Sequence, residues 1–449
     1  MGGVGDAAIV SKQRQTVFSR FGCQFTAPSG ILELMDDLGQ AMTVRPETLM
    51  LGGGNPAAVP AVQAVWRQRI TELLAEDGGA EFDRLLVNYD PPQGNPQFLA
   101  AFADLLRREL GWPVTAENVA ITNGTQTALF YLLNILGGDC DCVAPDVGMY
   151  SGKRRILLPL QPEYIGYADQ GIDPQLYVAC RPRMVWPRGE DGHVFRYEVD
   201  LDAVADRLAA GDIAAALVSR PANPTGGVLS DAEIQALTEL TAQHGAYFIV
   251  DGAYGVPFPG IVYGEANAFY APHVIHTFSL SKLGLPGTRT GLVVGPPEII
   301  KAISALNAIV GLANGNLGQR LALPLVESGE LLRLGELLRP YYWDLSQNCQ
   351  QAIEEFVGPS GQPWAIHESQ GAFFLWLWLP GLPGGSRALY ERLKAREVIV
   401  VPGEYFYYGA STGDWPQRTE CLRLSFSQSK DVVREGIRRL GAELAESRR

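Results

Sequence analysis

Three polar residues follow one another along this chain at a spacing of about thirty residues. Asn223 lies in an Asn-Pro-Thr-Gly turn, Asp251 comes next, and Lys282 ends the series. Each follows a short apolar run, and about thirty residues is the length of one strand–helix–strand crossover. We therefore expect the three side chains at the carboxyl ends of neighbouring strands, where open α/β sheets bind their ligands.

These groups have the chemistry that pyridoxal phosphate requires. The Lys282 amine can form a Schiff base with the aldehyde of that cofactor. The Asp251 carboxylate can keep the pyridine nitrogen protonated, so that the ring accepts electrons. Asn223 and Tyr254, which lies three residues after Asp251, can donate hydrogen bonds to the phenolic oxygen. The set predicts pyridoxal 5'-phosphate as the cofactor and no metal.

The phosphate of such a cofactor needs backbone amides and a cation. A Gly turn opens a predicted helix over residues 123–136, and the first amides of a helix have no partner within it. Arginine adds charge-assisted hydrogen bonds to a phosphate. The residues expected at the phosphate are Gly124, Thr125 and Gln126 at the helix start, and Ser279 and Arg289 on either side of the lysine.

Each of these signals has an ordinary structural interpretation when it is taken alone. Asn-Pro-Thr-Gly is a common turn, and a single lysine is most often a solvated surface residue. Ser279-Leu280-Ser281-Lys282 also matches the S-x-x-K signature of serine acylases, but the S-D-N and K-T-G segments of those enzymes are absent. The joint occurrence of the polar groups at crossover spacing is what favours the cofactor site.

The elements that must position these residues follow from the apolar pattern. Strand and helix patterns alternate from about residue 60 to 300, and the strands are apolar throughout, which predicts a mostly parallel sheet covered by helices on both faces. Ser230 and Glu233 form a capping box at the start of one of these helices. The expected strands near the site are 214–219, 246–250 and 274–280.

The pattern of predicted helices and strands changes after residue 300. A long helical region to about Phe356 precedes further strand-like runs and a charged amphipathic helix from about Lys430. We predict a large cofactor-binding domain and a smaller α+β domain, with an N-terminal segment packed against the latter. The runs are 372–379, 398–401 and 422–426, and the predicted divisions are 1–50, 51–325 and 326–449.

Composition limits the partners and the compartment. The chain has 449 residues and a formal net charge of −13, with no basic run, which argues against nucleic acid and an anionic membrane surface as partners. The longest apolar stretch, 372–379, is far short of the ~20 residues that span a bilayer. The six cysteines are scattered without zinc-ligand spacing, which fits a reducing compartment, and we expect the cytoplasm.

Several long segments resemble one enzyme family. They include LPLQPEYIGYAD, VSRPANPTGGVLSDAE, DGAYGVPFPGI, SLSKLGLPGTRTG and CLRLSFS. With them the chain resembles the fold-type I pyridoxal-phosphate enzymes of the aminotransferase superfamily, and within it the bacterial valine–pyruvate aminotransferases. The resemblance implies transfer of an amino group between valine, or a similar small apolar amino acid, and pyruvate.

The resemblance also implies roles for matching positions. Lys282 would move the proton from the substrate Cα, Asp251 would pair with the pyridinium, and Tyr164 would stack on the ring. Tyr89 resembles the residue that reaches the phosphate of a partner subunit, which implies a homodimer. Arg423 would clamp the substrate α-carboxylate. Gly54 and Asn223 would lie beside that carboxylate, and the family places Tyr254 at the phenolic oxygen.

Three further kinds of function stay open at this point. A lyase or a cyclase could use the same fold and cofactor, because a fold does not determine its chemistry. The second is a regulatory protein that binds the cofactor without catalysis, and the third is an S-x-x-K hydrolase. Ammonia release without an amino acceptor would favour the lyase, and acylation of Ser279 would favour the hydrolase.

Overall fold

The computed structural model describes residues 17–43, 47–144, 148–189, 192–409 and 415–447. The strands of its central sheet are β2 (Val119–Thr122), β3 (Gly138–Ala144), β4 (Gly148–Leu158), β5 (Tyr177–Ala179), β8 (Ile213–Ser219), β9 (Tyr247–Asp251), β10 (Val274–Ser279) and β11 (Gly291–Val294). Their order is β2-β11-β10-β9-β8-β4-β3, with β5 paired to β4. Only β3 and β11 run against the other strands of this sheet, so the predicted mostly parallel sheet is confirmed.

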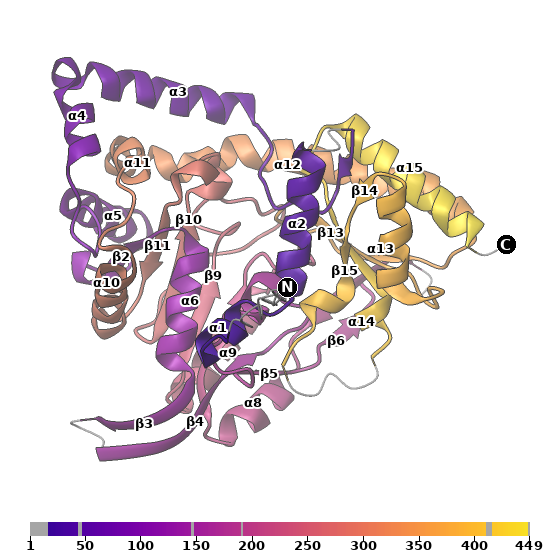
Figure 1. Cartoon of the computed structure of the whole chain (residues 1–449), viewed down its shortest axis with the longest axis horizontal. Coiled ribbons are helices and arrows are strands. Elements are labelled where there is room, and N and C mark those ends of the chain that lie inside the picture. The colour runs from indigo at the N-terminus through magenta and orange to yellow at the C-terminus, as the bar shows by residue number, and fades with distance from the viewer. Residues whose placement is uncertain (1–16, 44–46, 145–147, 190–191, 410–414, 448–449) are drawn as a thin grey trace, which may run out of the picture.

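Helices cover both faces of this sheet (Figure 1). Alternate strand residues point to opposite faces, so Ile249 packs in a cluster with α6 (Thr125–Leu136) and α10 (Pro297–Gly311). Phe248 and Val250 pack on the other side with α8 (Leu201–Ala209) and α9 (Asp231–Gln243). The predicted capping box begins α9, where Ser230 Oγ accepts from Glu233 N at 3.2 Å.

Further helices extend the large body of the molecule. They are α3 (Pro60–Ala75), α4 (Ala80–Val87), α5 (Pro96–Leu110), α7 (Ile165–Ala168) and α11 (Leu317–Ser328). Short 3₁₀ turns lie at η1 (Glu76–Gly79), η2 (Ala116–Asn118), η3 (Ser281–Leu283) and η4 (Pro286–Thr288). Among these, α7 and η3 carry residues that become important at the site.

A second, six-stranded sheet lies at the C-terminal side of the molecule. Its strands, in order, are β15 (Val401–Pro402), β16 (Cys421–Ser425), β13 (Phe374–Trp378), β12 (Ala365–His367), β7 (Val194–Glu198) and β6 (Arg183–Val185). The helical elements of this part are α12 (Glu330–Phe356), η5 (Gly358–Ser360), α13 (Gly385–Ala395), η6 (Gly403–Phe406), α14 (Gln417–Glu420) and α15 (Lys430–Glu446). Because β6 and β7 join this sheet, it draws on chain outside the predicted segment 326–449.

Strand β1 (Leu49–Met50) and helix α2 (Gly30–Thr43) lie against this second part (Figure 1). Strand β1 pairs in parallel with β14 (Val398–Ile399). Helix α2, which follows α1 (Arg20–Phe25), is tied to α13 by the ion pairs Glu33–Arg387 at 2.8 Å and Asp37–Lys394 at 2.5 Å. The domain divisions at residues 50 and 325 stay predictions, and part of the first segment lies outside the described residues.

None of the helices in the described ranges has the length and apolar character needed to cross a bilayer.

Candidate active site

The strands β8, β9 and β10 bring three polar residues into register at one edge of the sheet. Ser219 pairs with Asp251, and Asp251 pairs with Thr277. The Asp251 carboxylate accepts from Thr277 Oγ1 at 3.1 Å, from Ala253 N at 3.0 Å and from Tyr167 Oη at 2.5 Å. Burial raises the pKa of Asp251, while these three donors and the Lys282 charge act in the opposite direction.

Lys282 lies on the turn η3 that follows β10, and its side chain enters the same space. Its Nζ donates to Gly54 O at 2.8 Å and lies 5.5 Å from the centre of the Tyr254 ring. Burial, and then the positive charges of Arg289 and Arg423, lower the pKa of Lys282 to about 8. A neutral amine, which is the nucleophilic and basic form, is therefore accessible close to neutral pH.

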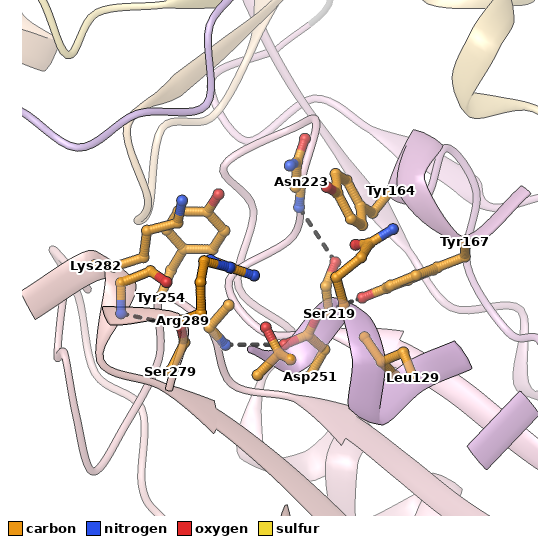
Figure 2. A pocket seen from close by; sticks show the side chains of 14 residues that line it. Leu129, Tyr164, Tyr167, Ser219, Asn223, Asp251, Tyr254, Ser279, Lys282 and Arg289 are labelled. Carbon is orange, nitrogen blue, oxygen red and sulfur yellow. Dashed lines mark hydrogen bonds between the residues drawn. The ribbon is translucent and has the colours of Figure 1, made fainter. Parts of the chain in front are cut away.

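A cavity of about 150 Å³ lies between these groups. Figure 2 shows Lys282, Tyr254 and Arg289 on one side of it and Tyr164 and Tyr167 on the other. The lining residues are Thr125, Gln126, Leu129, Tyr164, Tyr167, Ser219, Asn223, Asp251, Ala253, Tyr254, Ser279, Ser281, Lys282 and Arg289.

One end of this cavity is built for an anion. Helix α6 begins after Gly124, which has a φ of 86° and gives the helix no side-chain cap. A Cβ at Gly124 would lie 2.1 Å from Arg289 Nη2, so the guanidinium can approach the helix start only because this residue is glycine. The Gln126 side chain donates to Gly166 O at 2.9 Å, so it is the backbone amide of Gln126 that can face a ligand.

Tyr164 forms a wall of the cavity at the start of α7. Its ring lies against Gly166, where a Cβ would come within 2.3 Å of it, and its carbonyl accepts from Tyr408 Oη at 2.9 Å. The rings of Tyr164 and Tyr167 meet edge to face, with centroids 5.0 Å apart. This packing presents Tyr164 as a fixed surface on which a flat ring can stack.

A second cavity of about 520 Å³ shares four of these residues and adds Arg423. Arg423 is 2% exposed, and it donates from Nη1 to Asn223 Oδ1 at 2.9 Å and from Nη2 to Gly52 O at 2.6 Å. Its Nε has no hydrogen-bond partner among the described residues. A buried guanidinium with a donor left over is a binding group for a carboxylate.

The structure brings together all but one of the residues that the sequence predicts for the site. Those that line the two cavities are Gly54, Thr125, Gln126, Tyr164, Asn223, Asp251, Tyr254, Ser279, Lys282, Arg289 and Arg423, and Gly124 lies directly before Thr125. Tyr89 is the exception, because it is 84% exposed on the surface of this chain.

Sequence reasoning missed Tyr167, Thr277, Ser219 and Glu163. A signal for Tyr167 existed, because it lies three residues after Tyr164 and a helical turn places such residues on one face. Thr277 and Ser219 lie beside Asp251 only because of the way in which their strands pair with β9. A single sequence does not specify which strands pair or in what register.

The residues present fit pyridoxal phosphate. The amine with a lowered pKa, the buried carboxylate across the cavity and the aromatic wall match the reactive part of the group. The uncapped helix start beside Arg289 matches its phosphate, because backbone amides and a cation together stabilise an anion there.

Comparison with known proteins points to one family. The model of the family "Aminotransferase class I and II" matches residues 186–440. The valine–pyruvate aminotransferase of Escherichia coli K12 is 40% identical over 430 residues, which cover 95% of this chain and 98% of that protein.

Two solved structures agree with this match. The crystal structure of a putative amino-acid aminotransferase from Psychrobacter arcticum has a TM-score of 0.90 at 39% identity and covers 96% of this chain and 99% of that one. The valine–pyruvate aminotransferase of Salmonella typhimurium has a TM-score of 0.80 at 38% identity, with 92% and 98% covered.

Proposed function

Because this chain belongs to the class I and II aminotransferases, we propose that it moves an amino group between valine, or a similar small apolar amino acid, and pyruvate. The reaction gives alanine and the 2-oxo acid of the donor. The observation that carries the proposal is the Lys282 amine, with its lowered pKa, between two cavities that hold Asp251 and Arg423.

Enzymes of this family use pyridoxal 5'-phosphate, which when bound supplies an aldehyde and an electron-accepting ring. Asp251 would hold the ring nitrogen in its protonated form, and Asn223 and Tyr254 would donate to the phenolic oxygen. Lys282 would take the proton from the substrate Cα on Nζ and pass it on to the cofactor, as transfer of the amino group requires. The α6 amides, Ser279 and Arg289 hold the phosphate.

Arg423 and Gly54 bind the α-carboxylate of the substrate. In the structure, Arg423 is held by Asn223 and Gly52, and its Nε is left without a partner among the described residues. A carboxylate can accept from a guanidinium at two points, which fixes both the position and the orientation of the Cα. The Cα–H bond is thereby held toward Lys282.

The wall of the second cavity that would face the side chain of the amino-acid donor is apolar, and it therefore favours an apolar side chain. Ile31, Leu34 and Met35 of α2 line the second cavity with Met50 and Ile165. Among the described residues of this lining, Lys282 and Arg423 are the only cations, so a dicarboxylate side chain finds no cation beyond those used at the reacting end. Burial of an apolar side chain here contributes about 25 cal/mol per Å².

Product analysis tests the proposed reaction. Purified protein with pyridoxal phosphate, L-valine and pyruvate should form alanine and 3-methyl-2-oxobutanoate in equal amounts, and L-aspartate should be a much poorer donor. Release of ammonia without pyruvate would instead indicate a lyase, and no product from any apolar amino acid would contradict the proposal.

We further propose a homodimer with Tyr89 reaching the phosphate site of the second copy. Leu86, Val87 and Tyr89 are exposed, and Ile309 and Val310 are exposed at the end of α10. The loop that follows α10 lies beside α4, because the Asn316 side chain donates to Leu85 O at 2.9 Å. Exposed apolar side chains gathered in this way are typical of a protein interface.

The cytoplasm is the compartment that we propose. Among the described residues, Cys23, Cys180, Cys349 and Cys421 are free thiols. Reduced thiols in a large protein agree with a reducing compartment.

A further inference from the structure

Glu163 is a buried carboxylate that lies behind the cavity and does not line it. The residue is 2% exposed and directly precedes Tyr164. Its Oε1 accepts from Tyr164 N at 2.8 Å, and the same oxygen accepts from Ser219 Oγ at 2.5 Å. Its Oε2 accepts from Ser219 N at 3.0 Å. One carboxylate thus fixes the backbone beside the stacking tyrosine and the end of strand β8.

Ser219 carries this connection on to Asn223, which Figure 2 shows beside Tyr164. Its Oγ donates to Glu163 and accepts from Asn223 N at 3.2 Å, as the dashed line in Figure 2 shows for the second bond. Asn223 N therefore depends on a hydroxyl whose proton is directed away by Glu163. Tyr164, which is to stack on the cofactor ring, and Asn223, which is to donate to its phenolic oxygen, are thus joined through Glu163 and Ser219.

The charge on Glu163 matters to this arrangement. Three donors point at the carboxylate, and only an ionised carboxylate accepts at both oxygens without a proton of its own. Burial raises the pKa of Glu163, the hydrogen bonds from Ser219 and Tyr164 lower it, and the charge of Asp251 raises it, with a net pKa of about 7. Burial of an ionised carboxylate costs free energy unless its oxygen atoms accept hydrogen bonds.

We propose that Glu163 is a positioning residue, which fixes the positions of Tyr164 and Asn223 relative to each other at the cofactor ring by tying them together through Ser219. The inference rests on the proposed roles of Tyr164 and Asn223 at the cofactor ring. It adds a residue that touches neither cofactor nor substrate and that acts only through its neighbours.

Glu163→Gln tests this role, because an amide nitrogen must then face at least one of the three donors. We expect the Kd for pyridoxal phosphate, titrated into the full chain, to rise about tenfold, the loss of roughly one hydrogen bond to a charged group. The circular dichroism of the bound cofactor at its visible band should change too, since it depends on how the ring sits against Tyr164.

Glu443→Gln is the matched control. Glu443 is a buried carboxylate of α15 that accepts from Arg392 Nε at 2.6 Å, away from both cavities. Its variant should lose thermal stability and keep the wild-type Kd and dichroism. Cofactor binding by the wild type tests the proposed site itself, whereas the difference between the variants tests Glu163 alone.

Ser219→Ala provides a second variant if Glu163→Gln does not fold. It removes the hydroxyl that links Glu163 to Asn223, and it should raise the Kd in the same direction with a smaller change in dichroism. A wild-type Kd and wild-type dichroism in either folded variant would overturn the proposal.

Discussion

Lys282 and Asp251 share one cavity, and burial moves the pKa of each toward the other. The pKa of the amine falls to about 8 and that of the carboxyl rises, because both charged forms lose hydration. The hydrogen-bond donors around Asp251 favour its ionised form. At the residue scale the site therefore depends on a few hydrogen bonds that keep Asp251 ionised while Lys282 can lose its proton.

Tyr167→Phe tests that balance. Tyr167 Oη donates to Asp251 at 2.5 Å and lowers the pKa of that carboxyl, so its removal raises the pKa. Because Asp251 must be ionised, activity should be lost at a higher pH as the solution is acidified. We expect kcat/KM to fall about tenfold on the acid side, roughly the value of one charge-assisted hydrogen bond.

The control for this variant is Tyr263→Phe, which removes a hydroxyl that donates to Ala372 O at 2.6 Å outside the site. Its pH profile of kcat/KM should match the wild type. An unchanged acid limb in Tyr167→Phe would contradict the account of Asp251.

At this scale the sequence allowed most of the site to be predicted. Asn223, Asp251 and Lys282 follow apolar strands at crossover spacing, so their meeting at one edge is dictated by local pattern and by the geometry of parallel sheets. Thr277 and Glu163 could not be found in this way. Their contacts depend on which strands pair and on the path of a loop, which are non-local properties.

Single elements position whole groups of these residues. Helix α6 offers its first amides because Gly124 leaves its start uncapped. Helix α2 closes the second cavity with one face and is held to α13 by ion pairs from another. Helix α6 thus serves the phosphate end and helix α2 serves the second cavity. Substitutions in either helix leave Lys282 itself in place.

Gly124→Ala should weaken cofactor binding at the phosphate end. The φ of 86° disfavours alanine, and its Cβ would clash with the Arg289 guanidinium and displace it. Backbone strain of this kind costs about 1–3 kcal/mol, so the Kd for pyridoxal phosphate should rise about tenfold or more. In Gly287→Ala, where a Cβ meets nothing within 4 Å, a titration should give the wild-type Kd.

Leu34→Ala should change which amino acids are accepted. It enlarges the apolar wall of the second cavity, so kcat/KM for valine should fall about tenfold, while bulkier donors such as phenylalanine gain relative to valine. Leu32 lies on the same helix but does not line that cavity. Leu32→Ala should therefore leave the ratio of kcat/KM for phenylalanine to that for valine unchanged. Equal ratios in both variants would show that α2 does not select the side chain.

The strands of the central sheet and most helices were predictable, because the spacing of apolar residues within each segment indicates its secondary structure. The predicted strands at 214–219, 246–250 and 274–280 correspond to β8, β9 and β10 within one or two residues at each end. The second sheet was not predictable in full. Strand β7 pairs with β12, about 170 residues away, and no local pattern specifies such a partner.

At the scale of the whole molecule, the exposed apolar side chains near Tyr89 form the surface that we propose as a dimer interface. We expect a dimer in solution, with Tyr89 completing the phosphate site of the other copy. Val87→Asp places a charge on a side chain that is 77% exposed at the end of α4, and it should convert the dimer to monomers. Multi-angle light scattering measures the mass directly.

The matched variant is Leu337→Asp, which charges an exposed leucine of α12 outside the proposed interface. It should remain dimeric, and the Val87→Asp monomer should bind pyridoxal phosphate more weakly. A monomeric wild type, or a Val87→Asp dimer, would contradict the proposed interface.

We infer that Lys282, which shares its two cavities with Asp251 and Arg423, carries amino transfer from an apolar amino acid to pyruvate. The most direct measurement is the visible absorption spectrum of the protein loaded with pyridoxal phosphate, first with L-valine alone and then with pyruvate. The visible band should disappear with valine and return with pyruvate, whereas Lys282→Ala should show neither change and the surface variant Lys301→Ala should show both. A wild-type band that valine leaves unchanged would contradict the claim.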